Sequence, residues 1–119
     1  DGTSYASVVG EIVVNPQFEF YDFEAKYLDD ATTVKIPAAI PEEDAQLIQI
    51  AAMQAFDALG CSGLARCDFF YTHDNEIIIN EINTMPGFTR TSAYPKMWQA
   101  TGIGYSEVIT HLLTSALAR

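Results

Sequence analysis

Alternating hydrophobic and polar positions predict strands at the start of the chain. Residues 5–14 are rich in β-branched side chains, and residues 18–23 alternate aromatic with acidic ones; both patterns are typical of half-buried strands. An Asn-Pro pair lies between them, so we expect the two strands to form a hairpin. Residues 24–41 have neither a strand nor a helical period and exceed the length of an ordinary connection. They predict a loop, either a lid or a solvated linker.

Helical spacing follows in the later part of the chain. The clearest helix is residues 42–59, which begin with acidic residues, repeat apolar positions at helical intervals and are followed by glycine. We expect its apolar stripe to cover one face of a sheet. Farther on, Thr91 or Ser92 is placed to cap a short helix that ends near Gly102, and Ser106 to cap a last helix with an apolar stripe.

The middle of the chain predicts a second hairpin, in which polar side chains recur at every second position. Side chains of a strand alternate between faces, so Arg66 and Asp68 project together, as do Glu81 and Asn83. With the polar pair at 74–75 as the turn, Asp68 falls opposite Glu81 and Arg66 opposite Asn83. Two carboxylates that face each other across a strand pair repel, unless a cation or a proton lies between them.

The same register divides the other strand residues between two faces. The mostly apolar set that we expect under the long helix is Ala65, Cys67, Phe69, Tyr71, Ile78, Asn80 and Ile82. The set expected beside the charged residues, toward the turn, is Phe70, Ile77 and Ile79. Hairpin, loop, helix, hairpin and helices in this order predict an α+β fold, an antiparallel sheet packed with helices, and not a doubly wound parallel sheet.

Composition favours one folded domain. The chain has 119 residues, of which 49% are hydrophobic, enough for a core but too few for two ordinary domains. A net charge of −10 without a basic cluster argues against nucleic acid or an anionic membrane as partner. No apolar run is long enough to span a membrane. Cys61 and Cys67 are expected to be reduced thiols, which favours a cytoplasmic protein.

The charged face of the central hairpin suits a metal ion. Asp68, Glu81 and Asn83 bring oxygen-bearing side chains together without histidine or cysteine, which favours Mg²⁺ or Mn²⁺ over zinc. Because Mg²⁺ usually takes few carboxylates and completes its shell with water and phosphates, a phosphate ligand is implied. Arg66 could hold a phosphoryl group or an oxyanion. Alternatively, it could form a structural ion pair with Asp68 or Glu81.

Two further residues leave alternatives open. Phe70 offers an aromatic surface beside the carboxylates, on which a nucleotide base could rest, or it belongs to ordinary core packing. Gly87 follows Met-Pro in the turn after the hairpin. Because glycine has no side chain, its backbone N–H could approach a ligand closely, or the residue simply makes the turn.

Several strings of the chain, FEAKYLDDATTVKIPA, GLARCDFF and EIIINEINTMPGFTRTSAYPKMW, resemble the C-terminal part of D-alanine-D-alanine ligases, members of the ATP-grasp superfamily. The resemblance implies that residues 1–119 form an ATP-grasp C-terminal domain, with the N-terminal half of the enzyme absent. It also implies a reaction. ATP phosphorylates the carboxylate of one D-alanine, and the amine of a second attacks this acyl phosphate to form the dipeptide used in peptidoglycan. The isolated chain is expected to be inactive.

The resemblance assigns roles to the residues of the hairpin. Asp68, Glu81 and Asn83 would hold two Mg²⁺ (or Mn²⁺) ions that bridge the ATP phosphates and neutralise charge on the transferred group. Arg66 and the backbone amide of Gly87 would stabilise the oxyanion of the tetrahedral intermediate.

Other residues are assigned to the nucleotide, the substrate and the lid. The nucleotide-binding residues would be Lys26, which contacts the γ-phosphate, Phe20 and Phe70, which line the adenine pocket, and Asn80 and Glu81. Ser92 would hold the carboxylate of the second D-alanine. Tyr27 would orient the loop at 24–41, which becomes a lid that excludes water from the acyl phosphate.

The second substrate is the point on which relatives differ. A Lys-Tyr pair at 26–27 favours D-alanine over D-lactate and leaves D-serine open. The alternatives are a D-alanine-D-serine or D-lactate ligase relative, or a fragment that binds a cation or a partner chain without catalysis. In its full-length form, the enzyme is expected to be a homodimer.

Overall fold

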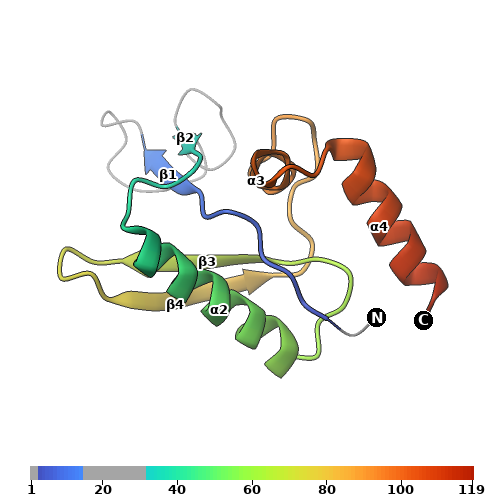
Figure 1. The fold of residues 1–119 in the computed structure, drawn as a ribbon, viewed down its shortest axis with the longest axis horizontal. Coiled ribbons are helices and arrows are strands. Elements are labelled where there is room, and N and C mark those ends of the chain that lie inside the picture. The colour runs from blue at the N-terminus through green and yellow to red at the C-terminus, as the bar shows by residue number, and fades with distance from the viewer. Residues whose placement is uncertain (1–2, 15–31) are drawn as a thin grey trace.

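The computed structural model describes residues 3–14 and 32–119, which have an α+β fold (Figure 1). In chain order the elements are β1 (Glu11–Val14), β2 (Thr32–Lys35), α2 (Glu42–Ala58), β3 (Arg66–Tyr71), β4 (Ile77–Asn83), α3 (Ala93–Thr101) and α4 (Tyr105–Leu117). β1 pairs with β2, and β3 with β4, both antiparallel. The predicted class, antiparallel strands packed with helices, is confirmed.

The first strand pair differs from the predicted one. β1 is shorter than 5–14 and pairs with β2, so that Glu11 lies opposite Lys35. β2 lies inside the segment 24–41, where a loop was predicted, and that prediction is wrong for these residues. The strand has the sequence TTVK, which is rich in β-branched residues but too short to establish a period. The predicted partner strand, residues 18–23, lies outside the described residues.

Ahead of β1, the chain is held by hydrogen bonds to two helices. The carbonyl of Ser7 accepts from Gln49 Nε2 of α2 at 2.8 Å, and Val8 N donates to Thr101 Oγ1 of α3 at 3.0 Å. Figure 1 shows this segment passing between α2 and α3. The start of the chain therefore links elements that are far apart in the sequence.

α2 matches the predicted helix to within one residue at its C-terminal end. Acidic residues occupy its first turn, where they complement the helix dipole. At the other end Gly60 has a φ of 67°. Gly60 N donates to Asp57 O at 3.1 Å, and Cys61 N donates to Phe56 O at 3.0 Å. These two bonds form the Schellman arrangement that commonly ends a helix at a left-handed glycine.

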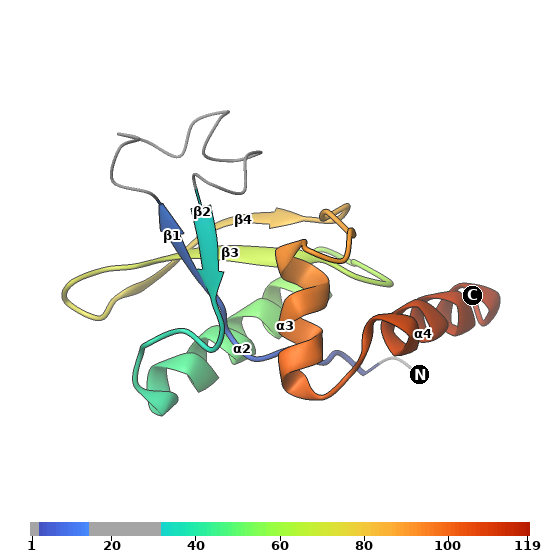
Figure 2. The ribbon, with the colours of Figure 1, turned by 90° about the horizontal axis from the view of Figure 1, so that it is seen from above.

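α2 covers one face of the β3–β4 hairpin, as expected (Figure 2). Cys67 Sγ lies 3.8 Å from the carbonyl oxygen of Ala52, and the hydroxyl of Tyr71 is hydrogen-bonded to the carboxylate of Asp44. Cys67 and Tyr71 therefore face α2. Because side chains of a strand alternate, the even-numbered residues of β3 face away from the helix.

The turn of the central hairpin is longer than predicted. Tyr71 lies opposite Ile77, and Thr72 N donates to Glu76 O at 3.0 Å, which leaves residues 73–75 as the loop instead of a two-residue turn. Its last residue, Asn75, has a φ of 62°. Asparagine tolerates this left-handed conformation better than most residues, so the prediction of a polar turn was right in kind and one residue short.

A β-bulge in β4 compensates for the longer turn. Phe69 pairs with Ile79 whereas Asp68 pairs with Glu81, so Asn80 is the extra residue of the bulged strand. The bulge restores the predicted register at the open end of the hairpin.

On the turn side of the bulge, the predicted division between faces is wrong for β4. Pairing there is shifted by one residue, and a one-residue shift moves each side chain to the other face. Ile78 pairs with Phe70, on the face away from α2. Ile77 and Ile79 pair with residues that face the helix, although they were expected on the charged face.

Glycines separate α3 from α4. α3 ends at Thr101 and is followed by Gly102, which has a φ of 104°, as expected. α4 begins after Gly104, and Glu107 Oε1 accepts from Gly104 N at 3.3 Å. The prediction that Ser106 caps this helix is wrong, because the helix already begins at Tyr105. The side chain of Glu107 accepts the hydrogen bond at the N-terminal end of the helix instead. No helix of the described part of the chain is long and apolar enough to cross a membrane.

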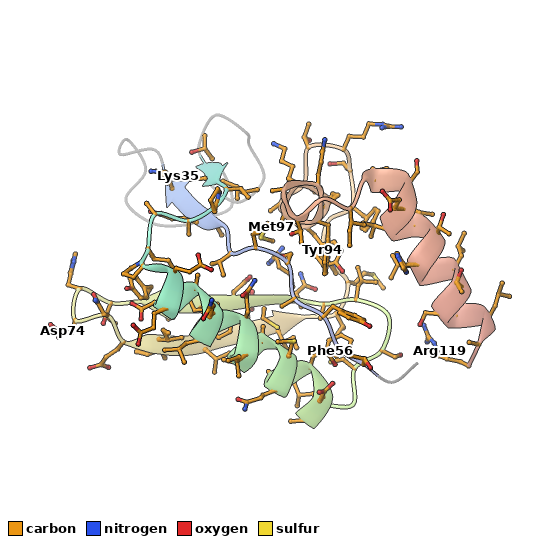
Figure 3. The ribbon with its side chains drawn as sticks, viewed as in Figure 1. Lys35, Phe56, Asp74, Tyr94, Met97 and Arg119 are labelled. Carbon is orange, nitrogen blue, oxygen red and sulfur yellow. The ribbon has the colours of Figure 1, made fainter. Side chains whose placement is uncertain are left out.

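Apart from Pro86 and Pro95, few apolar side chains of the described residues are buried. They are Ile48 of α2, Tyr94 of α3 and Val108 of α4, each at most 9% exposed. Figure 3 shows Tyr94 and Met97 pointing from α3 toward the middle of the molecule. Met97 Sδ lies 3.0 Å from the position that a Cβ on Gly10 would take, so the start of the chain packs closely on α3.

Many large apolar side chains are exposed instead. They include Leu47, Ile50, Phe70, Ile78, Ile79, Leu113 and Leu117. Helices and strands both contribute, so the described elements do not cover all of one another's apolar surface.

Candidate functional site

The central hairpin brings together the four polar site residues predicted on its strands. Arg66 pairs with Asn83, and Asp68 pairs with Glu81, as predicted. All four lie on the face away from α2, because the intervening cysteine faces the helix. Directly opposite side chains of an antiparallel pair have Cβ atoms about 5 Å apart, so this face concentrates charge at the open end of the hairpin.

Arg66 and Asp68 form an ion pair with two hydrogen bonds. Arg66 Nε donates to Asp68 Oδ1 and Arg66 Nη2 donates to Asp68 Oδ2, each at 2.9 Å. The two side chains are 25% and 21% exposed, so water screens the pair only in part. The guanidinium supplies a cation beside Asp68, one of the two carboxylates that face each other. Of the two interpretations that the sequence left open for Arg66, the ion pair is the arrangement observed.

The donor set on this face fits a hard divalent cation. Glu81 is exposed, and Asn83 Oδ1 accepts from Met85 N at 2.9 Å, which orients the amide. Carboxylate and amide oxygens keep a lone pair after accepting one hydrogen bond. Mg²⁺ needs only one or two protein carboxylates. Within residues 3–14 and 32–119, no group of three or more His, Cys, Asp or Glu side chains forms a metal cluster. A metal at this face would therefore depend on the amide as well as on the carboxylates.

The loop that follows β4, residues 86–92, is built around Ser92. Ser92 Oγ accepts from Thr89 N at 3.0 Å and is hydrogen-bonded to Thr89 Oγ1 at 2.7 Å. A Cβ on Gly87 would lie 3.1 Å from the same oxygen. The two predicted site residues of this loop are therefore neighbours, and a side chain at position 87 would crowd the Ser92 hydroxyl.

Ser92 precedes α3 as predicted, but its hydroxyl makes no capping hydrogen bond. The third residue of the helix is Pro95, which has no N–H to donate to a cap. The hydroxyl instead organises the loop through Thr89. The prediction was right about where the helix starts and wrong about what the serine does there.

Aromatic side chains of α3 and α4 hold the same loop. The ring of Phe88 lies 5.9 Å from that of Tyr94 and 5.2 Å from that of Tyr105, between centroids. Tyr105 OH donates to Phe88 O at 2.5 Å, and Arg90 Cζ lies 5.1 Å from the centroid of the Tyr105 ring. Burial raises the pKa of Tyr94 above its ordinary value of 10.0. Neither Thr89 nor Tyr105 was predicted as a site residue from the sequence.

A signal for these two residues does exist in the sequence. Hydroxyl residues three positions apart, as at 89 and 92, often bond to each other's backbone in turns. An aromatic residue with a polar tip at the start of a helix can reach a neighbouring loop. Neither signal identifies the partner, which comes from another part of the chain.

The remaining predicted residues fall into two groups. Phe70 lies on the charged face and is 58% exposed, so ordinary packing among the described residues does not account for it. Asn80 is the bulge residue of β4. Outside the described residues lie Phe20, Lys26 and Tyr27.

Comparisons with known proteins identify the family. A family model described as "D-ala D-ala ligase C-terminus" matches residues 1–114. The D-alanine-D-alanine ligase A of Salmonella typhimurium is 53% identical over 115 residues, covering 96% of this chain and 31% of the relative. The D-alanine-D-alanine ligase of an Arthrobacter species is 56% identical, covering 95% of this chain and 30% of the relative. The chain thus spans about a third of the length of the curated relatives it matches.

Solved structures agree in fold. D-alanyl-alanine synthetase A from Vibrio cholerae superposes with a TM-score of 0.79 at 34% identity, covering 100% of this chain and 36% of that one. The VanG D-Ala:D-Ser ligase from Enterococcus faecalis superposes with a TM-score of 0.77 at 40% identity, covering 91% of this chain and 31% of that one. The α+β arrangement described above is therefore that of the ATP-grasp C-terminal domain, and the chain belongs to the D-alanine-D-alanine ligase family.

Proposed function

We propose that this chain is the C-terminal domain of a longer ligase, which uses ATP to join two D-alanines for peptidoglycan synthesis. The observation that carries the proposal is the grouping of Arg66, Asp68, Glu81 and Asn83 on one open face, in a chain of this family. Two further findings support it. The matched relatives are named D-alanine-D-alanine ligases, and a similar structure from Bacillus anthracis is described as a complex with ATP.

Asp68, Glu81 and Asn83 would hold Mg²⁺ or Mn²⁺, as a pair of ions. When bound, such ions neutralise the charge that develops on a transferred phosphoryl group. The exposure of Glu81 and the oriented amide of Asn83 support the assignment. Asp68 would keep its contact with Arg66 while it binds metal, because each of its oxygens has more than one lone pair.

Arg66 and the N–H of Gly87 would stabilise the negative oxygen that forms when the amine of the second D-alanine attacks the acyl phosphate of the first. Arg66 is already held by Asp68 at two points, so it would lose little freedom on binding. Ser92 would bind the carboxylate of the second D-alanine through its hydroxyl. The contact between positions 87 and 92 supports a shared substrate, because both groups would address the same small region.

The nucleotide would lie beside the metal. Phe70, exposed next to the carboxylates, offers a ring for the adenine, and Asn80 a polar side chain at the bulge. Lys26 and Phe20 would complete the nucleotide site, and Tyr27 would orient the lid. Water exclusion matters because an acyl phosphate is readily hydrolysed.

The remainder of the active site would come from the part of the ligase that this chain does not span. The exposed apolar surface at Phe70 and Ile78 supports contact with a further domain or with the nucleotide. We therefore expect residues 1–119 alone to make no dipeptide. The homodimer expected from the family resemblance stays a prediction, which light scattering on the full-length protein would check.

Dipeptide synthesis by the full-length protein tests the proposal. With D-alanine, ATP and Mg²⁺, we expect D-alanyl-D-alanine and ADP to form in equal amounts, and we expect chelation of the metal to stop both. Asp68→Asn should lower kcat by about a hundredfold, the scale of removing one electrostatic group from a reacting site. Glu76→Gln, an exposed carboxylate in the turn region of the same hairpin, is the matched control and should leave kcat unchanged. Wild-type activity in Asp68→Asn, or activity without divalent metal, would contradict the assignment.

D-Serine as second substrate is a second candidate, favoured by one observation, the likeness to the VanG D-Ala:D-Ser ligase. Competition between D-alanine and D-serine in the same assay decides between the two. A larger kcat/KM for D-serine would replace the proposed product but leave the reaction class unchanged.

A further inference from the structure

We propose that Tyr105 is a positioning residue for the second amino acid substrate, because it fixes the peptide unit that orients the Ser92 hydroxyl. The inference rests on the proposed function for the identity of the substrate. It concerns a residue of α4 that belongs neither to the hairpin nor to the loop that carries the assigned groups.

The peptide unit between Phe88 and Thr89 is held at both ends. Its carbonyl oxygen accepts from Tyr105 OH at 2.5 Å, and its N–H donates to Ser92 Oγ at 3.0 Å. A peptide unit is planar and rigid, so the direction of its C=O determines the direction of its N–H. Tyr105 thus acts on the hydroxyl of Ser92 through a single rigid group.

Tyr105 also restrains the residues on either side of Thr89. Its ring lies 5.2 Å from that of Phe88, and Arg90 Cζ lies 5.1 Å from its centroid. Phe88 in turn lies 5.9 Å from the ring of Tyr94, which is buried. The phenol therefore contributes one directional bond, and the ring contributes packing and a cation–π contact.

Ser92 depends on this restraint because its hydroxyl makes no capping hydrogen bond to α3. A serine before a helix ordinarily bonds to backbone N–H groups of the first turn, but the third helical residue is Pro95. The hydrogen bonds observed for the Ser92 hydroxyl are both to Thr89, one to its backbone N and one to its Oγ1. Thr89 therefore sets the orientation of this hydroxyl. When both of these groups donate, the lone pairs of Ser92 Oγ are filled and its own proton is available to a substrate carboxylate.

The substitution Tyr105→Phe isolates the directional bond, because it keeps the ring and its contacts with Phe88 and Arg90. In the full-length protein we expect the KM for the second D-alanine to rise about threefold to tenfold, the range for one lost hydrogen bond. We expect kcat and the KM for ATP to stay within about twofold of the wild-type values. In hydrogen exchange, the amide of Thr89 should exchange faster, and the amides of α2 should not change.

Tyr71→Phe is the matched control. It also removes a tyrosine hydroxyl that bonds across elements, in this case to Asp44 of α2. Tyr71 faces α2 and lies on the opposite face of the hairpin from Arg66 and Asp68. Removing its hydroxyl should therefore lower the melting temperature without changing the KM for D-alanine. A second variant, Tyr105→Leu, removes the ring as well and should accelerate exchange across residues 86–92, whichever substrate the enzyme uses.

Equal KM values for the second D-alanine in Tyr105→Phe and the wild type would overturn the inference. So would a parallel rise in the KM for ATP, which a merely structural role would produce. If the unsubstituted full-length protein forms neither dipeptide nor ADP, the proposed function fails and the substrate role falls with it. Even then, unchanged exchange at Thr89 in Tyr105→Phe would separately refute the positioning of the loop.

Discussion

The substitution Gly87→Ala places a methyl group where it would crowd Ser92 in the loop after β4. The new Cβ would lie 3.1 Å from Ser92 Oγ and 3.7 Å from Ser92 Cβ. The second distance is an ordinary contact, whereas the first is shorter than carbon and oxygen normally approach. Ser92 Oγ cannot retreat freely, because it is hydrogen-bonded to Thr89 N at 3.0 Å and to Thr89 Oγ1 at 2.7 Å.

The cost can be estimated from these contacts. A shift of a few tenths of an ångström disturbs the bonds to Thr89, and losing one such bond costs about 0.5 to 1.5 kcal/mol. Inserting a methyl group into a filled site costs about 1 to 3 kcal/mol, with the lower end appropriate to an exposed loop. We therefore expect Gly87→Ala to lower the free energy of unfolding by about 1 to 2 kcal/mol.

Urea unfolding of a double-mutant cycle measures this cost and its cause. Ser92→Ala removes the oxygen and leaves only the ordinary 3.7 Å contact. In that background Gly87→Ala should cost less by about 1 kcal/mol, a coupling typical of residues in contact. If the alanine at 87 costs the same with and without the hydroxyl, the clash with Ser92 is not its cause, and the close approach of the two residues does not account for the glycine.

Other contacts give three further predictions. Arg66→Gln should lower the melting temperature, because it leaves Asp68 without its cation. In a thermal shift assay, added Mg²⁺ should restore part of the lost melting temperature. An equal decrease with and without Mg²⁺ would count against a metal at this face. Burial raises the pKa of Cys67 above its ordinary value of 9.0, so its contribution to stability is present below that pH and lost as the pH rises through the folded pKa. Urea unfolding at neutral and alkaline pH should show a smaller alkaline loss in Cys67→Ala than in the wild type, and equal losses would contradict this. Gly10→Ala, with its Cβ 3.0 Å from Met97 Sδ, should destabilise by about 1 to 3 kcal/mol, and the same cost in a Met97→Ala background would exclude that contact as the reason.

The parts of the fold that the sequence predicts are those fixed by local chemistry. The helix at Glu42–Ala58 has its acidic start, apolar spacing and terminal glycine within one stretch, and it forms as expected. The pairing of Asp68 with Glu81 was also predicted, although from a turn that is too short. Two departures, the longer turn and the bulge at Asn80, cancel at the open end of the hairpin, so the register there is correct.

The parts that the sequence does not predict depend on partners distant in the chain. Thr32–Lys35 becomes a strand because β1 is available to pair with it, and four residues give no period to detect. The hydroxyl of Ser92 bonds to Thr89 and not to the first turn of α3, whose third residue, Pro95, has no N–H, and Tyr105 reaches the loop from another helix. Patterns of residue types locate candidate groups, whereas the contacts that orient those groups require the folded chain.

The bulge at Asn80 has a consequence for how β4 can vary in length. Ile79 and Glu81 are two positions apart and would share a face in a regular strand, yet the bulge assigns them to opposite faces. A relative that lacks residue 80 could keep every cross-strand pair, because Ile79 and Glu81 would then be adjacent and alternate normally. Losing Ile82 instead would bring Asn83 opposite Cys67 and turn its amide toward α2. A one-residue deletion in this strand therefore preserves the cross-strand pairs of Asp68 and Arg66 when it removes the bulge residue, and breaks the pair of Arg66 with Asn83 when it falls beyond the bulge.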